Sequence, residues 1–289
     1  MNQRAAALRA HLQSGRSLLM PGVFDALSAR LAARAGFEVM FVSGYGMSAT
    51  QLGEPDVGLL SATEVVTTAT RICSATDVPI VVDADTGYGD AVNVVRTVGE
   101  LVRAGAAGIF LEDQVWPKRC GHMRGKRVIP MDEQVAKLRA AVEARGDSGL
   151  VVVARTDARQ AVGLDDAIAR ALAYRDAGAD ALFVEAPQSL DELREIGRRL
   201  PPPLVANMVE GGATPDLTAE ELRDLGFQWV VFPVAGLFAA THALQTVYAH
   251  LRSDGHTRAV RDRQLSFAEF NAMIGLEEKY ALAEKFGAK

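Results

Sequence analysis

Short apolar runs alternate with amphipathic segments along most of the chain. Eight runs are rich in Val, Ile and Phe, and they cover residues 17–20, 38–44, 78–85, 107–113, 149–157, 179–186, 203–208 and 228–234. Continuous apolar runs of this length are typical of strands buried on both faces, as in a parallel sheet. Between and after them, amphipathic segments predict helices at about 24–35, 62–76, 91–104, 131–145, 165–177, 189–199, 218–225 and 236–252.

Several predicted helices end in the same way, with a basic residue and then a glycine just before the next strand. The stretches are ARAGF, VRAGAAG, YRDAGAD and RDLGF. A glycine there can adopt the left-handed C-cap, and the cation complements the helix C-terminus. Eight repeated strand–helix units predict an α/β fold, the (β/α)8 TIM barrel. The alternative is a doubly wound open sheet, which is disfavoured because no G-x-G-x-x-G follows the first strand.

The chain continues beyond the eighth predicted helix. We expect residues 1–252 to form the barrel domain, and residues 253–289 to form a polar linker (253–265) and a helical extension. Ser266 and Glu269 have capping-box spacing and predict the start of a terminal helix. Its apolar positions pack against the chain's own outer helices or, as we expect, against another subunit; they are Phe267, Phe270, Met273, Ile274, Tyr280 and Leu282.

Composition narrows the class of protein. Of 289 residues, 49% are hydrophobic and 23% are charged, which is typical of a globular protein and excludes a disordered chain. The net charge of −5 and the absence of a basic block argue against nucleic acid as a partner. The sequence contains no run of 18 apolar residues and no apolar signal core near its start, so no membrane partner is expected. Two cysteines do not make a disulfide framework, and we expect a cytoplasmic location.

Polar side chains follow six successive predicted strands. In TIM barrels, reactive groups lie at these carboxyl ends of the strands. The packing of an apolar core does not require polar groups at these positions, so the pattern predicts an active site. In strand order the residues are Ser43, Gly44 and Tyr45, then Asp83 and Asp85, then Glu112, then Arg155, then Glu185, and finally Asn207.

The acids among them suggest a metal site. Asp83 and Asp85 are two residues apart on a predicted strand, so both side chains should point to the same face. Two carboxylates about 6 Å apart repel each other by roughly 3 kcal/mol at an effective dielectric constant near 20. Oxygen-only ligands such as Asp83, Asp85 and Glu112 suit Mg²⁺, with Mn²⁺ as an alternative ion. A set of salt bridges with Arg155 is the other explanation for these carboxylates.

The segment 114–126 after the fourth strand is cationic and contains two glycines. It predicts a mobile loop that closes over an anionic ligand. Cys120 is flanked by Lys118, Arg119 and His122, and positive charge should lower its pKa and suit the thiol to proton transfer or attack. The alternative is an inert structural thiol. After the seventh strand, we expect Asn207 and Thr214 to donate hydrogen bonds to a substrate carboxylate.

Lys118-Arg-Cys-Gly-His122, after a Glu-Asp-Gln strand end, resembles the K-[KR]-C-G-H signature of the isocitrate lyase/phosphoenolpyruvate mutase superfamily. This resemblance implies a barrel enzyme that binds Mg²⁺ and a 2-oxo or enolpyruvate-like acid at the strand ends. It also implies a homotetramer in which the C-terminal helices are exchanged, or swapped, between subunits. Supporting stretches are PGVFDALSA (21–29), LGEPDVGLL (52–60), DADTGYG (83–89), ARTDAR (154–159) and LVANMVEGGATP (204–215).

The same resemblance implies a role for each site residue. Asp85 would contact Mg²⁺, with Asp83 and Glu112 holding it directly or through waters. Cys120 would be the general acid, and Tyr45 is our hypothesis for the base, with a relayed water as the alternative. The remaining catalytic residues are Lys118, His122 and Arg155. The substrate-binding residues would be Ser43, Gly44, Tyr45, Asp85, Gly121, His122, Arg155, Glu185, Asn207 and Thr214.

These roles imply a Mg²⁺-dependent C–C lyase that converts a substituted 2-hydroxy di- or tricarboxylate into pyruvate and a second acid. Methylisocitrate lyases read S-G-G-G and T-E-F-G-A-T-P where this chain has residues 43–46 and 209–215. These departures favour resemblance to the dimethylmalate lyase, petal-death and carboxyphosphonoenolpyruvate mutase members, and 2-methylisocitrate remains an alternative substrate. The alternative functions are a carboxyphosphonoenolpyruvate- or phosphoenolpyruvate-type phosphonomutase, an oxaloacetate hydrolase, and a catalytically silent binding protein.

Overall fold

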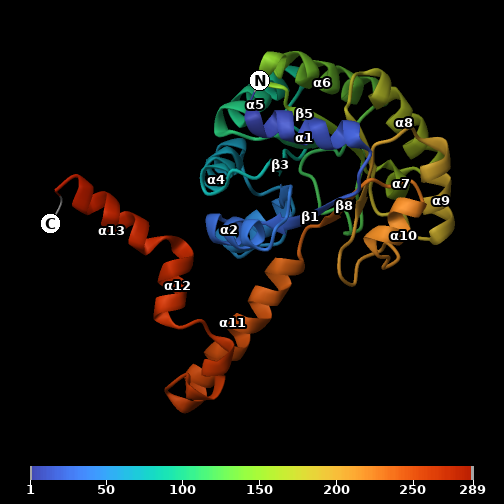
Figure 1. Ribbon diagram of the computed structural model, residues 1–289. Coiled ribbons are helices and arrows are strands. Elements are labelled where there is room, and N and C mark those ends of the chain that lie inside the picture. Colours follow the sequence, from blue (N-terminus) through green and yellow to red (C-terminus); the bar gives the residue numbers. More distant parts are fainter. Residues whose placement is uncertain (1, 288–289) are drawn as a thin grey trace. The chain divides into compact units, whose positions relative to one another are not determined.

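Eight parallel strands close into a barrel in the computed structural model, which describes residues 2–287 (Figure 1). Strand order follows chain order, and β8 pairs with β1 to complete the ring. This closure confirms the TIM barrel and excludes the open sheet. The strands are β1 (Leu18–Val23), β2 (Met40–Val42), β3 (Ile80–Asp83), β4 (Gly108–Glu112), β5 (Val151–Thr156), β6 (Ala181–Val184), β7 (Leu204–Asn207) and β8 (Trp229–Phe232).

Helices surround the strands (Figure 1). They are α2 (Ala26–Arg34), α3 (Gly44–Leu52), α4 (Ala62–Ser74), α5 (Ala91–Ala104), α6 (Met131–Ala144), α7 (Ala158–Ala161), α8 (Leu164–Asp176), α9 (Leu190–Arg199) and α10 (Ala219–Asp224). Helix α1 (Gln3–Ser14) precedes β1, and helix α11 (Ala235–Asp254) follows β8. A 3₁₀ turn, η1 (Gly146–Ser148), precedes β5. The predicted glycine caps are confirmed, because Gly36, Gly105, Gly178 and Gly226 all have positive φ angles, between 88° and 102°. No helix within residues 2–287 is long and apolar enough to cross a membrane.

Side chains at alternate positions along the strands contribute to two separate hydrophobic cores. Side chains of one parity fill the inside of the barrel, where the rings of Phe41 and Phe110 lie 4.7 Å apart and those of Phe110 and Phe183 lie 5.5 Å apart. Side chains of the other parity pack between the strands and the helices. Because side chains alternate along a strand, the inward parity continues upward into the strand ends. The residues reached in this way are Ser43, Asp83, Glu112, Arg155, Glu185 and Asn207.

The chain separates into two compact units, Met1–Leu237 and Phe238–Lys289. In the second unit, the predicted capping box is present: Ser266 Oγ accepts from Glu269 N (3.2 Å), and Ser266 N donates to Glu269 Oε2 (2.8 Å). The predicted single terminal helix is wrong, because Gly275 has a φ of 83° and divides it into α12 (Phe267–Ile274) and α13 (Leu276–Lys285). The linker contains a 3₁₀ turn, η2 (Arg258–Arg263). Subunit exchange and a domain boundary at residue 252 remain predictions.

Candidate active site

Helix α3 begins directly after β2 and lies against the acids that follow β3. Ser43 is its N-cap, and its Oγ accepts a hydrogen bond from Gly46 N (3.1 Å). A Cβ on Gly44 would lie 2.8 Å from Asp83 Oδ2 and 3.4 Å from Asp85 Oδ1, so a larger residue would collide with this pair. The amide groups of a helix N-terminus favour an anion. Ser43, Gly44 and the first turn of α3 therefore offer an anion-binding surface beside the acids.

The predicted metal-binding acids are all buried at the strand ends. Asp83 ends β3, but Asp85 has left the strand with a φ of 47°, so the expectation that both acids share a strand face is wrong. The turn nevertheless brings both carboxylates close to Gly44. Burial, together with the negative charge of Asp85, raises the pKa of Asp83 to about 7. Burial also raises the pKa of Glu112, and Arg155 opposes this.

Two buried cations neutralise part of this charge. Lys118 donates to Asp56 Oδ1 (2.6 Å), and its Nζ lies 2.7 Å from Asp85 Oδ1. Arg155 lies 3.3 Å from Glu112 Oε2, which is the salt bridge that sequence reasoning offered as an alternative to metal binding. The two explanations are compatible, because Arg155 occupies only one oxygen of Glu112 and leaves Oε1 without a hydrogen-bond partner.

The acids fit a hard divalent cation. Six buried carboxyl groups lie around Lys118, Lys126 and Arg155, and Glu112 Oε1 is buried with no hydrogen-bond partner. The donors are all oxygen atoms, as Mg²⁺ prefers. Within residues 2–287, no three acids, histidines or cysteines lie close enough together to hold a metal by themselves. Waters would therefore complete the coordination shell, as is usual for Mg²⁺. The six carboxyl groups belong to Asp56, Asp83, Asp85, Glu112, Asp157 and Glu185.

The cationic segment 114–126 folds over the strand ends, with Cys120 half-buried. Cys120 N donates to Asp56 O (3.0 Å). Burial raises the pKa of the thiol to about 11; the backbone amide of His122 opposes this rise, and the charges of Asp56 and Glu185 add to it. The predicted lowering of this pKa is wrong, since Lys118 is already paired with two carboxylates. The thiol is therefore a proton donor at neutral pH and not a ready nucleophile.

The next two residues of this segment contact the end of β6. A Cβ on Gly121 would overlap the Glu185 carboxylate, so glycine is required there. His122 Nδ1 accepts from Ala213 N (2.9 Å), and His122 Nε2 lies 3.1 Å from Glu185 Oε1. His122 therefore links the loop after β7 to the carboxylate that follows β6.

Glu185 and Asn207 also meet at the strand ends. Asn207 Nδ2 donates to Glu185 Oε1 (3.2 Å). Although burial acts to raise it, Arg155 and His122 hold the pKa of Glu185 below its usual value. Thr214 is not brought into this cluster; it lines a separate cavity of about 20 Å³ with Glu210 and Phe232.

Sequence reasoning missed several residues of the site. Asp56 and Asp157 pair with Lys118 and Arg155, respectively. Tyr88 donates to Asp85 Oδ2 (2.9 Å), and the centroids of the Tyr88 and Trp116 rings lie 5.8 Å apart in a T-shaped arrangement. Asp56 and Tyr88 lie inside the stretches LGEPDVGLL and DADTGYG, so the signal was present in those motifs. Tyr45, the predicted base, is half-buried in the first turn of α3.

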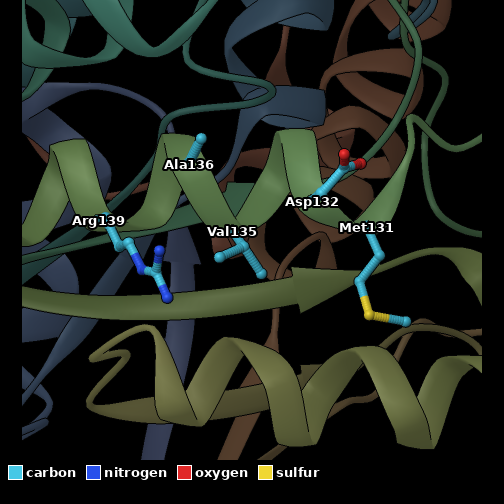
Figure 2. Close-up of a pocket in the computed structure, with 5 residues that line it drawn as sticks. All are labelled: Met131, Asp132, Val135, Ala136 and Arg139. Carbon is cyan, nitrogen blue, oxygen red and sulfur yellow. The ribbon is translucent and has the colours of Figure 1, made fainter.

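A wider cavity, of about 520 Å³, lies elsewhere and is open to solvent. Figure 2 shows the residues that line it along α6, with Met131, Val135 and Arg139 on one side of the helix. None of the predicted site residues lines this cavity. The strand ends therefore remain the candidate active site.

Comparison with known proteins identifies the family of this chain. A family model described as "Phosphoenolpyruvate phosphomutase" matches residues 8–252. Carboxyvinyl-carboxyphosphonate phosphorylmutase, chloroplastic, from Arabidopsis thaliana is 50% identical over 273 residues, which are 93% of this chain and 80% of that protein. The 2,3-dimethylmalate lyase of Eubacterium barkeri is 45% identical over 274 residues, which are 95% of each chain.

A solved structure gives the same result. The crystal structure of 2,3-dimethylmalate lyase, described as a PEP mutase/isocitrate lyase superfamily member, superimposes with a TM-score of 0.93 and 37% sequence identity. The match covers 98% of this chain and 95% of that one. Family model, sequence relatives and solved structure thus agree, and the chain belongs to the phosphoenolpyruvate phosphomutase family of the isocitrate lyase/phosphoenolpyruvate mutase superfamily.

Proposed function

We propose that this chain is a Mg²⁺-dependent carbon–carbon lyase. Its substrate would be a substituted 2-hydroxy dicarboxylate of the 2,3-dimethylmalate type, with 2-methylisocitrate as the tricarboxylate alternative, and its products would be pyruvate and a second carboxylic acid. The observation that carries the proposal is the position of Cys120, whose backbone N–H is held by Asp56 O (3.0 Å) next to a buried set of acids and Arg155. The 45% identity to 2,3-dimethylmalate lyase supports the same reaction class.

Substrate binding would use both anion-binding elements of the site. The N-terminus of α3, with Ser43, Gly44 and Tyr45, would bind the carboxylate of the pyruvyl half. Arg155 and Asn207 would hold the other carboxylate. Asp85, with Asp83 and Glu112 directly or through waters, would hold Mg²⁺. When bound, this ion polarises the oxygen that becomes the 2-keto group.

Cleavage needs a base and an acid at opposite ends of the breaking bond. Tyr45 would accept the proton of the 2-hydroxyl group, with a relayed water as the alternative. The electron pair of the C2–C3 bond passes to C3 as the keto group forms, and Cys120 would protonate that carbon. A thiol with a pKa of about 11 stays protonated until the carbanion develops, as a general acid must. Arg155 would balance the negative charge that accumulates.

A second candidate is a phosphonomutase, which the 50% identity to carboxyvinyl-carboxyphosphonate phosphorylmutase favours. The P–O bond of an enolpyruvyl phospho compound would then break as its phosphorus forms a P–C bond, and the same acids would line the site. The two reactions are separable by ³¹P NMR, because only the mutase produces a phosphonate resonance. An oxaloacetate hydrolase is a third outcome, and it would release oxalate.

The test measures pyruvate release, coupled to lactate dehydrogenase, from 2,3-dimethylmalate and from 2-methylisocitrate. Each acid is assayed with Mg²⁺, with Mn²⁺ and after EDTA, and oxaloacetate is assayed in parallel for oxalate. We expect metal-dependent pyruvate from one alkylated acid. Cys120→Ser should lose at least about 100-fold in kcat, a typical contribution of one general acid. Full turnover by Cys120→Ser on every acid would contradict the proposed role of the thiol.

We further propose a homotetramer that exchanges its C-terminal helices, and a cytoplasmic location. Support for assembly comes from exposed apolar side chains in the second unit, among them Phe267 (86% exposed), Tyr280 (59%) and Leu282 (51%). Support for a reducing compartment comes from Cys73 and Cys120, both of which are free thiols.

A further inference from the structure

Lys126 and Asp157 form an ion pair in which neither side chain is exposed to solvent. Lys126 lies at the end of the 114–126 segment, and Asp157 follows β5. Lys126 Nζ donates to Asp157 Oδ1 (2.7 Å) and to Gly121 O (2.5 Å). Complete burial of two charges adds little to stability, because desolvation offsets their attraction. Their placement therefore points to a role in positioning.

Asp157 is also the carboxylate that orients Arg155. Arg155 Nε donates to Asp157 Oδ2 (2.9 Å), and an Arg155 terminal nitrogen donates to Asp157 Oδ1 (3.0 Å). This fork fixes the plane of the guanidinium group. One oxygen atom, Asp157 Oδ1, thus accepts from both Lys126 and Arg155.

Asp157 is itself held from behind. Its backbone N–H donates to Asp113 Oδ1 (2.9 Å), and Asp113 Oδ2 accepts from Thr156 Oγ1 (2.7 Å) and Tyr174 Oη (2.8 Å). Asp113 and Thr156 have the outward parity of β4 and β5, and Tyr174 belongs to α8. Asp157 is therefore anchored to side chains of the outer layer of the barrel.

The other acceptor of Lys126 lies next to the thiol. Gly121 follows Cys120, and its Cα packs against the Glu185 carboxylate. The hydrogen bond from Lys126 fixes the Gly121 carbonyl, while Cys120 N is held by Asp56 O. Without Lys126, the Gly121 carbonyl would lose this hydrogen bond, while Cys120 N would keep its bond to Asp56 O and His122 its contacts with Ala213 and Glu185.

We propose that Lys126 and Asp157 are a positioning pair that ties the Cys120 segment to the carboxylate that orients Arg155. Cys120, the proposed proton donor, and Arg155, the proposed substrate-binding cation, would then be held in their catalytic positions by the same pair. The catalytic consequence rests on the proposed lyase function, whereas the effect on access to the thiol does not.

The first test measures alkylation of Cys120 by iodoacetamide at pH 8, followed by mass spectrometry, in Lys126→Met. Cys73, buried in α4, is the internal reference in the same molecule. Arg124→Met removes an exposed cation from the same segment and is the matched control. We expect Cys120 labelling in Lys126→Met to rise on the order of tenfold, as local opening increases, with Cys73 and the Arg124→Met protein unchanged.

The second test separates kcat from KM on whichever acid the wild-type enzyme cleaves. Lys126→Met should lower kcat by about tenfold with a smaller change in KM, because Arg155 keeps its partner. Asp157→Asn should also raise KM, because the orientation of Arg155 is lost. If Lys126→Met does not fold, the same measurements are made on Lys126→Gln, which keeps a neutral hydrogen-bond donor at this position.

Two results would overturn the proposal. One is a folded Lys126→Met protein with wild-type labelling of Cys120, and the other is an equal rise at Cys73, which would indicate general loosening. A wild-type enzyme inactive on all the acids would overturn the proposed function alone, since the labelling comparison needs no turnover.

Discussion

The Cys120 thiol has its pKa raised from near 9 to about 11, chiefly by burial. At pH 8, such a thiol is about 0.1% ionised, compared with about 10% for one with a pKa of 9. We therefore predict that Cys120 reacts with iodoacetamide roughly 100-fold more slowly in the folded protein than in the urea-unfolded chain. The rate should climb through pH 9–11, as measured by mass spectrometry.

The raised pKa of Cys120 also makes the folded protein lose stability as the pH rises. The folded state favours the protonated thiol, so the contribution of Cys120 to the free energy of unfolding is complete below about pH 9 and is lost as the pH rises to about 11. Cys120→Ala should remove this part of the alkaline loss in urea titrations. If iodoacetamide labelled Cys120 at pH 8 as fast in the folded protein as in the urea-unfolded chain, the raised pKa of this thiol would be contradicted.

Gly121 provides a steric test at the same scale. A methyl group there would overlap the Glu185 carboxylate, so Gly121→Ala should displace the Cys120 segment and lower kcat/KM by at least about 100-fold. Gly99→Ala is the matched control, because its Cβ would meet nothing closer than 3.6 Å inside α5 and alanine is the better helix former. That control should keep full activity and gain up to about 1 kcal/mol in stability.

At the scale of elements, the sequence predicted the eight strands and the eight helices that follow them, because each carries a continuous apolar run or an amphipathic stripe. It missed α1, α3 and α7. In α1 only Ala5 and Leu8 are buried, so no stripe marks it. Helix α3 contains two glycines and starts inside the stretch 38–44 that was predicted as a strand.

Part of the candidate site was predictable from the sequence in the same way. The alternation of side chains along the strands predicted that four residues would lie at the inner strand ends, namely Asp83, Glu112, Arg155 and Glu185. Partners that depend on how loops fold, such as Lys118 with Asp56 or Lys126 with Asp157, were not predictable. The direction of the Cys120 pKa shift was wrong for the same reason, since flanking cations in the sequence were paired elsewhere in space.

Helix α1 nevertheless contributes to the barrel. Leu8 is fully buried in the core that fills the inside of the barrel. Leu8→Ala should lower the free energy of unfolding by about 2–5 kcal/mol, measured by urea denaturation. Leu27→Ala, at a position 38% exposed on α2, is the control and should cost less than half as much. Equal costs would show that α1 adds nothing to that core.

At the scale of the whole molecule, the proposed tetramer is tested by light scattering after size exclusion. Replacing Phe267, which is 86% exposed on α12, by Glu should shift the mass toward smaller species. Val92→Glu changes an equally apolar side chain, 77% exposed on α5, and should leave the mass unchanged. A monomeric wild-type protein would overturn the proposed assembly and leave the active-site assignments intact.

The contact between Tyr88 and Trp116 gives this molecule an optical reporter of its own. The chain has two tryptophans: Trp116 is 42% exposed on the 114–126 segment, and Trp229 is fully buried inside the barrel. Acrylamide should quench the red-shifted emission of Trp116 and leave the blue-shifted emission of Trp229 nearly untouched. A change in Trp116 emission in a stopped-flow experiment would thus report movement of the 114–126 segment when substrate binds, without an added label.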